Sequence, residues 1–155
     1  FNGIIKYLYD ISKGDIKNEI DITSSSYSGG SVPQNVVMYD KKNRFCSTGN
    51  DAQPWICFDF RDKRVILSHY TIRVSDYSHP RSWIVGGSND YLCWAAIDKQ
   101  VQCQALNGDF RVHTFPVSCS QQYKYIRIMQ TDRSWSRSDL FIIDSFEIYG
   151  DLLVN

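Results

Sequence analysis

Residues 83–98 constrain the fold most, because they place two apolar segments around a polar, glycine-containing stretch: W-I-V-G-G-S-N-D-Y-L-C-W-A-A-I-D. The first three residues favour a pleated, half-buried strand. Residues 86–90 tolerate positive φ and form side-chain-to-backbone hydrogen bonds, so we expect a tight turn there. We expect Trp94 to return the chain to the core. Short strands joined by tight turns are therefore the expected building blocks.

Three other segments alternate apolar and polar residues, at 71–74, 125–128 and 146–149. This period of two predicts half-buried strands. The segment at 55–60 carries Ile56, Phe58 and Phe60 on one face and Trp55, Cys57 and Asp59 on the other. Because both of its faces are largely apolar, we expect a central strand. Short strands with frequent turn signals favour an all-β sandwich or barrel over βαβ units.

The sequence predicts one helix, a short turn at residues 32–39 with Ser31 as its N-cap and Pro33 in its first turn. Turn-forming residues dominate the segments between the strands, at 24–31, 40–53, 75–82, 99–108 and 131–139. Because loops carry a large share of functional residues, we expect ligand contacts there.

The chain has 155 residues, the size of one compact domain. We expect a single domain over residues 1–155, cut from a larger protein. Its 17 basic and 17 acidic residues balance, so no overall field attracts nucleic acid or an anionic membrane. We therefore expect no nucleic-acid partner. The sequence also has no signal-like or membrane-length apolar run.

The five cysteines make an odd number, so at least one thiol stays unpaired. No cysteine lies before Cys46 or after Cys119, so no disulfide can join the two ends of the domain, and no asparagine lies in an N-x-S/T sequence. Both features favour a reduced, intracellular (cytoplasmic) setting. An extracellular setting is the alternative, because Cys93 and Cys103 can still pair.

Four motifs follow one another along residues 5–150. They are P-W-I-C-F-D-F at 54–60, the stretch at 83–98, Y-K-Y-I-R-I at 123–128 and S-F-E-I-Y-G at 145–150. Together they resemble the discoidin family, also called the coagulation-factor type C module. The resemblance implies an all-β, eight-stranded antiparallel jelly-roll β-sandwich of the galactose-binding-like type. Such modules hold ligands with loops at one end and have no catalytic machinery.

The sequence H-P-R-S-W-I-V-G-G-S-N-D at residues 79–90 is most similar to discoidin-like modules that accompany BTB domains. The resemblance implies an intracellular protein-interaction or scaffolding domain, attached to other domains, with a protein partner. The alternative is a lectin-like module that recognises terminal galactose-type sugars on a glycan. Phospholipid binding is a weaker alternative. Residues 29–31 are small and polar, so we expect no stable membrane insertion.

In modules of this family three loops face the ligand, and here they correspond to residues 25–32, 45–51 and 76–82. The first loop offers Tyr27, which either stacks on a sugar or partner or covers the end of the sandwich. The second loop adds Phe45 and Asn50 as candidate contacts.

The third loop carries His79 and Arg81 just before a strand. An imidazole beside a guanidinium fork can clamp a planar polar ligand, and glycan-binding relatives use this combination with an aromatic residue. Arginine beside aromatic residues also suits a protein contact. In the alternative interpretation Arg81 pairs with Asp76 and His79 is solvated.

A fourth loop, T-D-R-S-W-S-R-S-D at residues 131–139, places Trp135 between Arg133 and Arg137. Trp135 either stacks on a ligand with the arginines as donors, or folds back onto the sandwich. In the second case the arginines pair with the aspartates of the same loop. These residues complete the candidate ligand site.

Asp40, Asn43 and Glu147 correspond to positions where some glycan-binding relatives hold calcium. Basic residues flank the first two, so we expect no metal and no cofactor. The three histidines lie apart and accompany no nucleophile motif, so we expect no catalytic residue and no enzyme.

Overall fold

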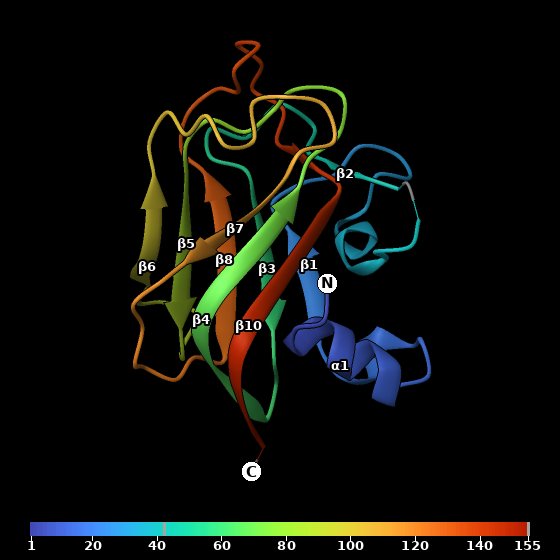
Figure 1. The fold of residues 1–155 in the computed structure, drawn as a ribbon, viewed down its shortest axis with the longest axis vertical. Coiled ribbons are helices and arrows are strands. Elements are labelled where there is room, and N and C mark those ends of the chain that lie inside the picture. The colour runs from blue at the N-terminus through green and yellow to red at the C-terminus, as the bar shows by residue number, and fades with distance from the viewer. Residues whose placement is uncertain (42, 155) are drawn as a thin grey trace.

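A computed structural model describes residues 1–41 and 43–154. The strands form a five-stranded sheet, in the order β1-β3-β8-β5-β6, and a three-stranded sheet, in the order β10-β4-β7 (Figure 1). All of their pairings are antiparallel. The expected eight-stranded antiparallel sandwich is therefore confirmed. The short strands β2 and β9 form a separate pair.

The elements have the following bounds: α1 Ile4–Ile11, η1 Ile16–Asn18, β1 Asp21–Ser24, η2 Pro33–Val37, β2 Phe45–Cys46, β3 Trp55–Asp59, β4 Lys63–Arg73, β5 Trp83–Ser88, β6 Ala95–Gln100, β7 Val112–Pro116, β8 Tyr125–Gln130, β9 Ile142–Ile143 and β10 Ser145–Val154.

One hydrophobic core lies between the two sheets. Phe58 of β3 stacks on Phe146 of β10, with ring centroids 5.2 Å apart, and both side chains are fully buried. β3 lies between β1 and β8, as its two apolar faces predicted. The indole N–H of Trp83 donates to the Tyr70 hydroxyl at 2.9 Å, and that hydroxyl donates to Asp98. The buried aromatic polar groups are thus hydrogen-bonded.

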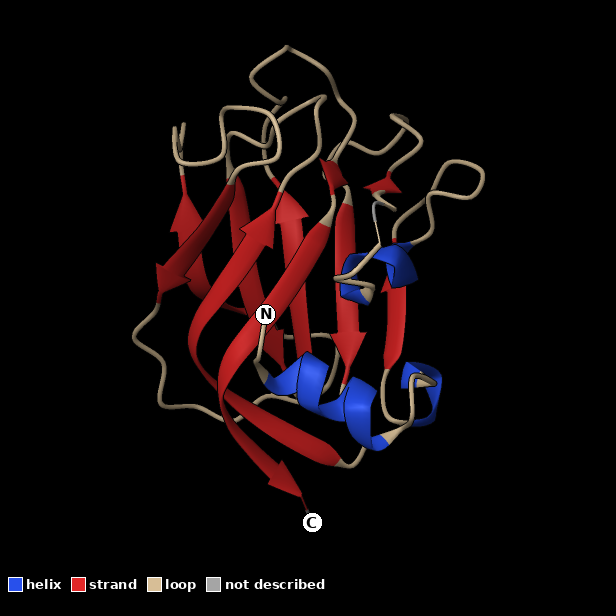
Figure 2. Cartoon of the chain, turned by 45° about the vertical axis from the view of Figure 1, so that its right-hand side comes forward, coloured by secondary structure: helices blue, strands red, loops and turns tan. Residues whose placement is uncertain are grey.

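The expectation of a single helix was wrong, because α1 is a second one. Figure 2 shows α1, η1 and η2 gathered on one side of the sandwich. The buried stripe of α1 consists of Ile4, Ile5 and Leu8. The backbone N–H groups of Gly3 and Lys6 donate to the carboxylate of Glu147 in β10. The N-cap residue is Gly3, which has no side chain to accept them. A cap supplied by the last strand leaves no local start signal in the sequence.

The turn expected at residues 32–39 is the 3₁₀-helix η2, Pro33–Val37, with the proline in its first turn as predicted. Its N-cap is Val32 rather than Ser31, and no side chain caps it. The carbonyl of Ser31 instead accepts the Cys46 N–H at 3.2 Å. Ser31 therefore joins the neighbouring loops.

The turn expected at residues 86–90 lies farther along the chain, because β5 continues to Ser88. Gly87 is part of the strand, and a Cβ there would lie 2.5 Å from the ring of Tyr123. The Asp90 carboxylate forms the turn by accepting the N–H groups of the two residues at 92 and 93. Trp94 does not return to the core. It is half-buried, and the Arg127 guanidinium lies 3.9 Å from its ring centroid.

All five cysteines are free in the described chain, including Cys93 and Cys103. Burial raises the pKa of the Cys57 thiol to about 12, whereas Cys93 is exposed. No helix within residues 1–41 and 43–154 has the length and apolar character needed to cross a membrane.

Candidate functional site

Five loops gather at one end of the sandwich, at the top in Figure 1, and we call this the loop end: residues 25–31, 47–54, 74–82, 101–111 and 131–141. Backbone hydrogen bonds join them. The Ser47 N–H donates to the Phe141 carbonyl at 3.1 Å, and the Trp135 N–H donates to the His79 carbonyl at 3.0 Å. Loops held to one another in this way can present a defined surface.

His79 and Arg81 are largely committed to contacts within the protein. His79 Nε2 lies 3.0 Å from the carbonyl oxygen of Ser75 and 3.3 Å from Asp109 Oδ1. Arg81 pairs with Asp132 and not with Asp76, so the partner expected in the alternative interpretation was wrong. With 14% of each side chain exposed, neither residue is freely available to a ligand.

Trp135 folds back onto the loops. Its indole N–H donates to the carbonyl oxygen of Cys103 at 3.0 Å, and the Arg81 guanidinium lies 5.4 Å from its ring centroid. Arg133 pairs with Asp139 at 3.1 Å. Arg137 is exposed and, among the described residues, forms no ion pair. This geometry matches the second interpretation of the sequence, in which Trp135 folds back onto the protein instead of facing a ligand.

The two earlier loops hold the other predicted contacts. Tyr27 is 53% exposed and Asn50 is exposed, so both can reach a ligand. Phe45 cannot, because it is fully buried with its ring 5.9 Å from that of Phe141. Its assignment as a ligand contact was therefore wrong. The Ser25 hydroxyl donates to the carboxylate of Asp51 at 2.9 Å, and this contact joins the two loops.

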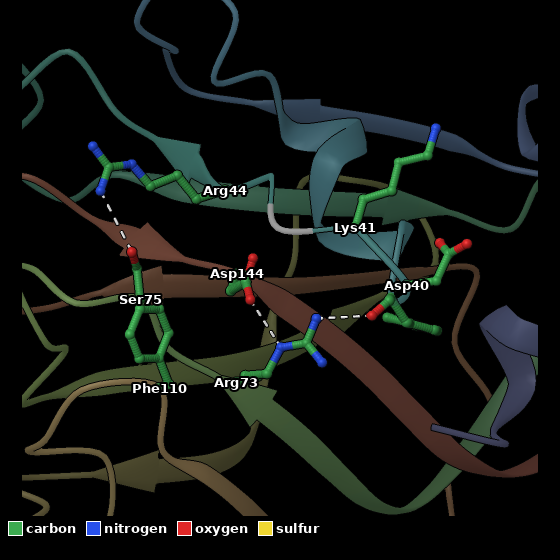
Figure 3. Close-up of a pocket in the computed structure, with 8 residues that line it drawn as sticks. Asp40, Lys41, Arg44, Arg73, Ser75, Phe110 and Asp144 are labelled. Carbon is green, nitrogen blue, oxygen red and sulfur yellow. Dashed lines mark hydrogen bonds and ion pairs between the residues drawn. The ribbon is translucent and has the colours of Figure 1, made fainter.

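A pocket of about 430 Å³ opens beside the loop end (Figure 3). Its lining residues are Tyr39, Asp40, Lys41, Arg44, Arg73, Ser75, Phe110 and Asp144. We call this the side pocket. It combines the aromatic rings of Tyr39 and Phe110 with hydrogen-bond donors and acceptors.

Arg73 is the fixed centre of the side pocket. Its Nε lies 2.8 Å from Asp144 Oδ2, and its Nη2 donates to the Tyr39 carbonyl at 2.9 Å. Both charged side chains are mostly buried, so the pair is held in one orientation. Burial raises the pKa of Tyr39 well above its ordinary value, and the hydroxyl keeps its proton and donates to Phe146.

The rim of the side pocket is more exposed. Phe110 is 59% exposed and has φ 57, a left-handed conformation that is uncommon outside glycine. Arg44 lies 3.6 Å from Asp76 and 3.4 Å from the Ser75 hydroxyl, with 43% of its side chain exposed. Phe110 offers a ring face, and Arg44 keeps donors free for a ligand.

The sequence did not reveal the side pocket. Phe110 lies just beyond the loop expected at residues 99–108, and Arg73 was assigned only to a strand. Asp144 lies between two strands and meets Arg73 only through the fold. The one local signal was an aromatic residue between charged neighbours in D-F-R, at residues 109–111.

The positions at which some glycan-binding relatives hold calcium have other contacts here. Glu147 faces α1, and Asp40 lines the side pocket. Within the part of the chain that the structure describes, no three or more His, Cys, Asp or Glu side chains group in a way that could hold a metal ion.

The fold and its loop end define a jelly-roll β-sandwich of the galactose-binding-like class. No family model and no curated protein matches the chain. Solved structures are similar to it. The CpGH89CBM32-5 module of Clostridium perfringens, in complex with GalNAc-β-1,3-galactose, matches with a TM-score of 0.70 at 7% identity, over 86% of this chain and 97% of that chain.

Two further structures have the same fold. CBM32-3, from a family 31 glycoside hydrolase of Clostridium perfringens, gives a TM-score of 0.71 at 14% identity, over 86% of this chain and 92% of that chain. Chitosan-binding module 1, from a chitosanase/glucanase of Paenibacillus sp. IK-5, gives a TM-score of 0.69 at 18% identity, over 86% of this chain and 96% of that chain. At these identities the likeness is one of fold, and it agrees with the fold that the four motifs implied.

Proposed function

We propose that this domain is a non-catalytic module that binds a carbohydrate in the side pocket. The observation that carries the proposal is the combination of the exposed Phe110 ring with Arg44 and the fixed Arg73–Asp144 pair. A sugar has apolar C–H faces and hydroxyl groups that both donate and accept. An aromatic surface with a few oriented polar groups suits such a ligand.

The structural neighbours support this function over the protein-scaffold function that the BTB-associated resemblance implied. Those named above are a module solved with GalNAc-β-1,3-galactose, a module of a glycoside hydrolase and a chitosan-binding module. The BTB-associated branch, the attachment to other domains and the intracellular location stay predictions.

A glycan array tests the proposal directly. The purified domain is screened under reducing conditions, with and without calcium. We expect selective binding to one class of neutral sugar that does not require calcium. Arg44→Gln should weaken that binding about tenfold, the scale of one hydrogen bond to a charged group. Phe110→Ala should also weaken it, because it removes the apolar ring face that the sugar covers.

Tyr27→Ala is the matched control for Phe110→Ala, because the two side chains are similarly exposed, at 53% and 59%, on different loops. Loss of binding in Tyr27→Ala alone would move the site to residues 25–32. A blank array from folded protein would reject carbohydrate binding altogether.

A further inference from the structure

The outer face of the five-stranded sheet carries a second surface, separate from the loop end. In β8, Tyr125, Arg127 and Met129 are half-buried and alternate with buried residues, so they point away from the core. Gly86 of β5 lies opposite Arg127, and Ala96 of β6 lies opposite Gly86 on its other side. Small residues therefore adjoin the arginine on the same face of the sheet.

The small residues leave a hollow of about 170 Å³, which we call the sheet hollow. It is lined by Ile84, Gly86, Trp94, Ala95, Ala96, Arg127 and Met129. Arg127 stacks on Trp94, with 3.9 Å between the guanidinium carbon and the ring centroid. The hollow thus joins an apolar floor to a positively charged rim.

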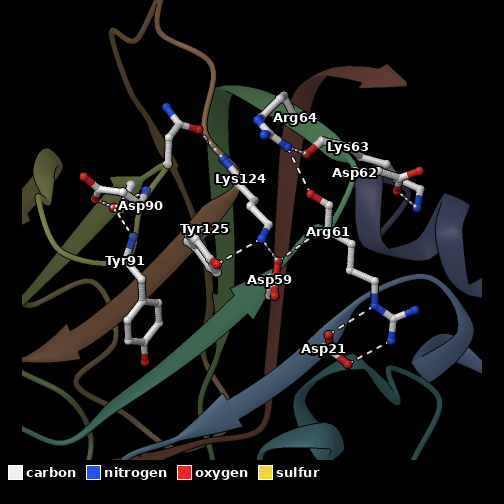
Figure 4. Close-up of polar contacts among 12 residues, drawn as sticks. Asp21, Asp59, Arg61, Asp62, Lys63, Arg64, Asp90, Tyr91, Lys124 and Tyr125 are labelled. Atoms are coloured by element: carbon white, nitrogen blue, oxygen red, sulfur yellow. Dashed lines mark hydrogen bonds and ion pairs between the residues drawn. The ribbon is translucent and has the colours of Figure 1, made fainter. Parts of the chain in front are cut away.

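The charge of Arg127 is not neutralised. Its guanidinium has no ion pair and no hydrogen bond within residues 1–41 and 43–154. Asp59, on the same face, already accepts the Arg61 N–H at 2.8 Å and lies 3.8 Å from Lys124 Nζ (Figure 4). Lys99 lies opposite Ile84 at the edge of the same face and adds a further positive charge. The surface is complementary to an anion.

The sheet hollow has the wrong chemistry for sugar hydroxyls. None of its lining side chains is a strong acceptor, and the Trp94 indole N–H already donates to the Tyr91 carbonyl at 3.2 Å. Aliphatic walls beside a free guanidinium suit an aliphatic side chain next to a carboxylate. Arginine, tryptophan and methionine are also enriched at protein interfaces.

We propose that the sheet hollow binds an acidic peptide segment of a partner protein. A peptide carboxylate accepts two N–H groups from Arg127, and a neighbouring aliphatic side chain fills the space over Gly86 and Ala96. This surface does not depend on the side pocket, and its failure would leave the proposed carbohydrate function intact.

The test is selection of a phage-displayed library of random linear peptides on the intact domain, followed by titration of the selected peptides. We expect peptides with Asp or Glu beside Leu, Ile or Val, and affinity that falls as salt rises. Arg127→Met keeps the apolar stem over Trp94 and should weaken binding about tenfold. Ala96→Leu fills the hollow and should also weaken it, while the charge remains.

Arg137→Met is the matched control, because Arg137 is an exposed arginine at the loop end. It should bind the peptides as the wild type does, and circular dichroism should show all three variants folded. Peptides without carboxylates, or affinity unchanged in Arg127→Met, would overturn the proposal. Arg127-dependent binding of trigalacturonate, with no peptide selected, would also overturn it in favour of an acidic sugar.

Discussion

Glu147 keeps its carboxylate inside the domain because four backbone N–H groups surround it. Those of Gly3 and Lys6 reach Oε2 at 3.1 and 2.9 Å, and those of Ile5 and Ile148 reach Oε1 at 2.9 and 2.8 Å. Burial raises the pKa of this carboxyl above its ordinary value, although the four N–H groups lower it. Three of these groups lie at the start of α1, where the helix dipole also favours a negative charge.

Glu147→Gln is expected to lower the free energy of unfolding by about 1–3 kcal/mol, because an amide nitrogen replaces one acceptor and faces donors. Urea denaturation followed by tryptophan fluorescence measures the change. Asp151→Asn, on the exposed part of β10, removes the same charge and should change the free energy by less than about 0.5 kcal/mol. Equal values for the two variants would contradict the capping role.

The cysteines are expected to differ in reactivity, because the thiolate is the reactive form. Cys93 is exposed, whereas Cys57 is buried with its pKa raised to about 12. Titration of the native domain with a chromogenic disulfide should show a fast phase that Cys93→Ser removes. Cys57 should react only after denaturation. A fast phase that persists in Cys93→Ser would contradict this order.

Among the elements, β5 continues as a strand through Gly87, which packs against the ring of Tyr123. The ring of Tyr123 occupies the space where a side chain on residue 87 would lie, so the strand can continue there only without a Cβ. A register shift between Val85 and Gly86 accompanies this packing. Glycine at this position therefore reflects close packing rather than a turn.

Gly87→Ala is expected to destabilise the domain by about 1–3 kcal/mol, because the added methyl group overpacks against Tyr123. Thermal unfolding measures the loss. Gly30→Ala is the control, because a Cβ there meets nothing within 4 Å. A Gly87→Ala variant as stable as Gly30→Ala would show that the ring moves aside without cost.

Trp135 is expected to contribute to the stability of the loop end. Because its indole bonds Cys103 and packs against Arg81, Trp135→Ala should lower the free energy of unfolding by about 2 kcal/mol, less than the ~3–5 kcal/mol of a fully buried tryptophan. Denaturant unfolding checks this value. Unchanged stability together with lost glycan binding would contradict this packing role and assign Trp135 to the ligand site.

At the scale of the whole molecule, the side pocket and the sheet hollow have no lining residue in common. A glycan in the first and a peptide on the second should therefore bind independently. Isothermal titration of a selected peptide at saturating glycan is expected to give a Kd within about twofold of the value without glycan. A larger change would show that the two proposed surfaces are coupled or overlap.

The period-two pattern of the sequence predicted most of the strands. The features that it did not predict depend on tertiary packing. Residues 55–59 and 125–128 are in strands as expected, because alternating bulky side chains can be buried in only one register. α1 was missed because its cap is Glu147, far along the chain. The Arg73–Asp144 pair was missed for the same reason. The exposure of Tyr27 and the burial of Phe45 depend on packing that residue type alone does not specify.

The contact between Gly3 and Glu147 spans 144 positions, and it orders events during synthesis. Because chains emerge from the ribosome with the N-terminus first, residues 4–11 leave it long before their cap is made. At that stage strand β10 has not been synthesised, so the apolar stripe of α1 has no strand to pack against. A nascent chain that ends before Glu147 would expose this stripe to chaperones. The first helix along the chain is therefore among the last elements to pack.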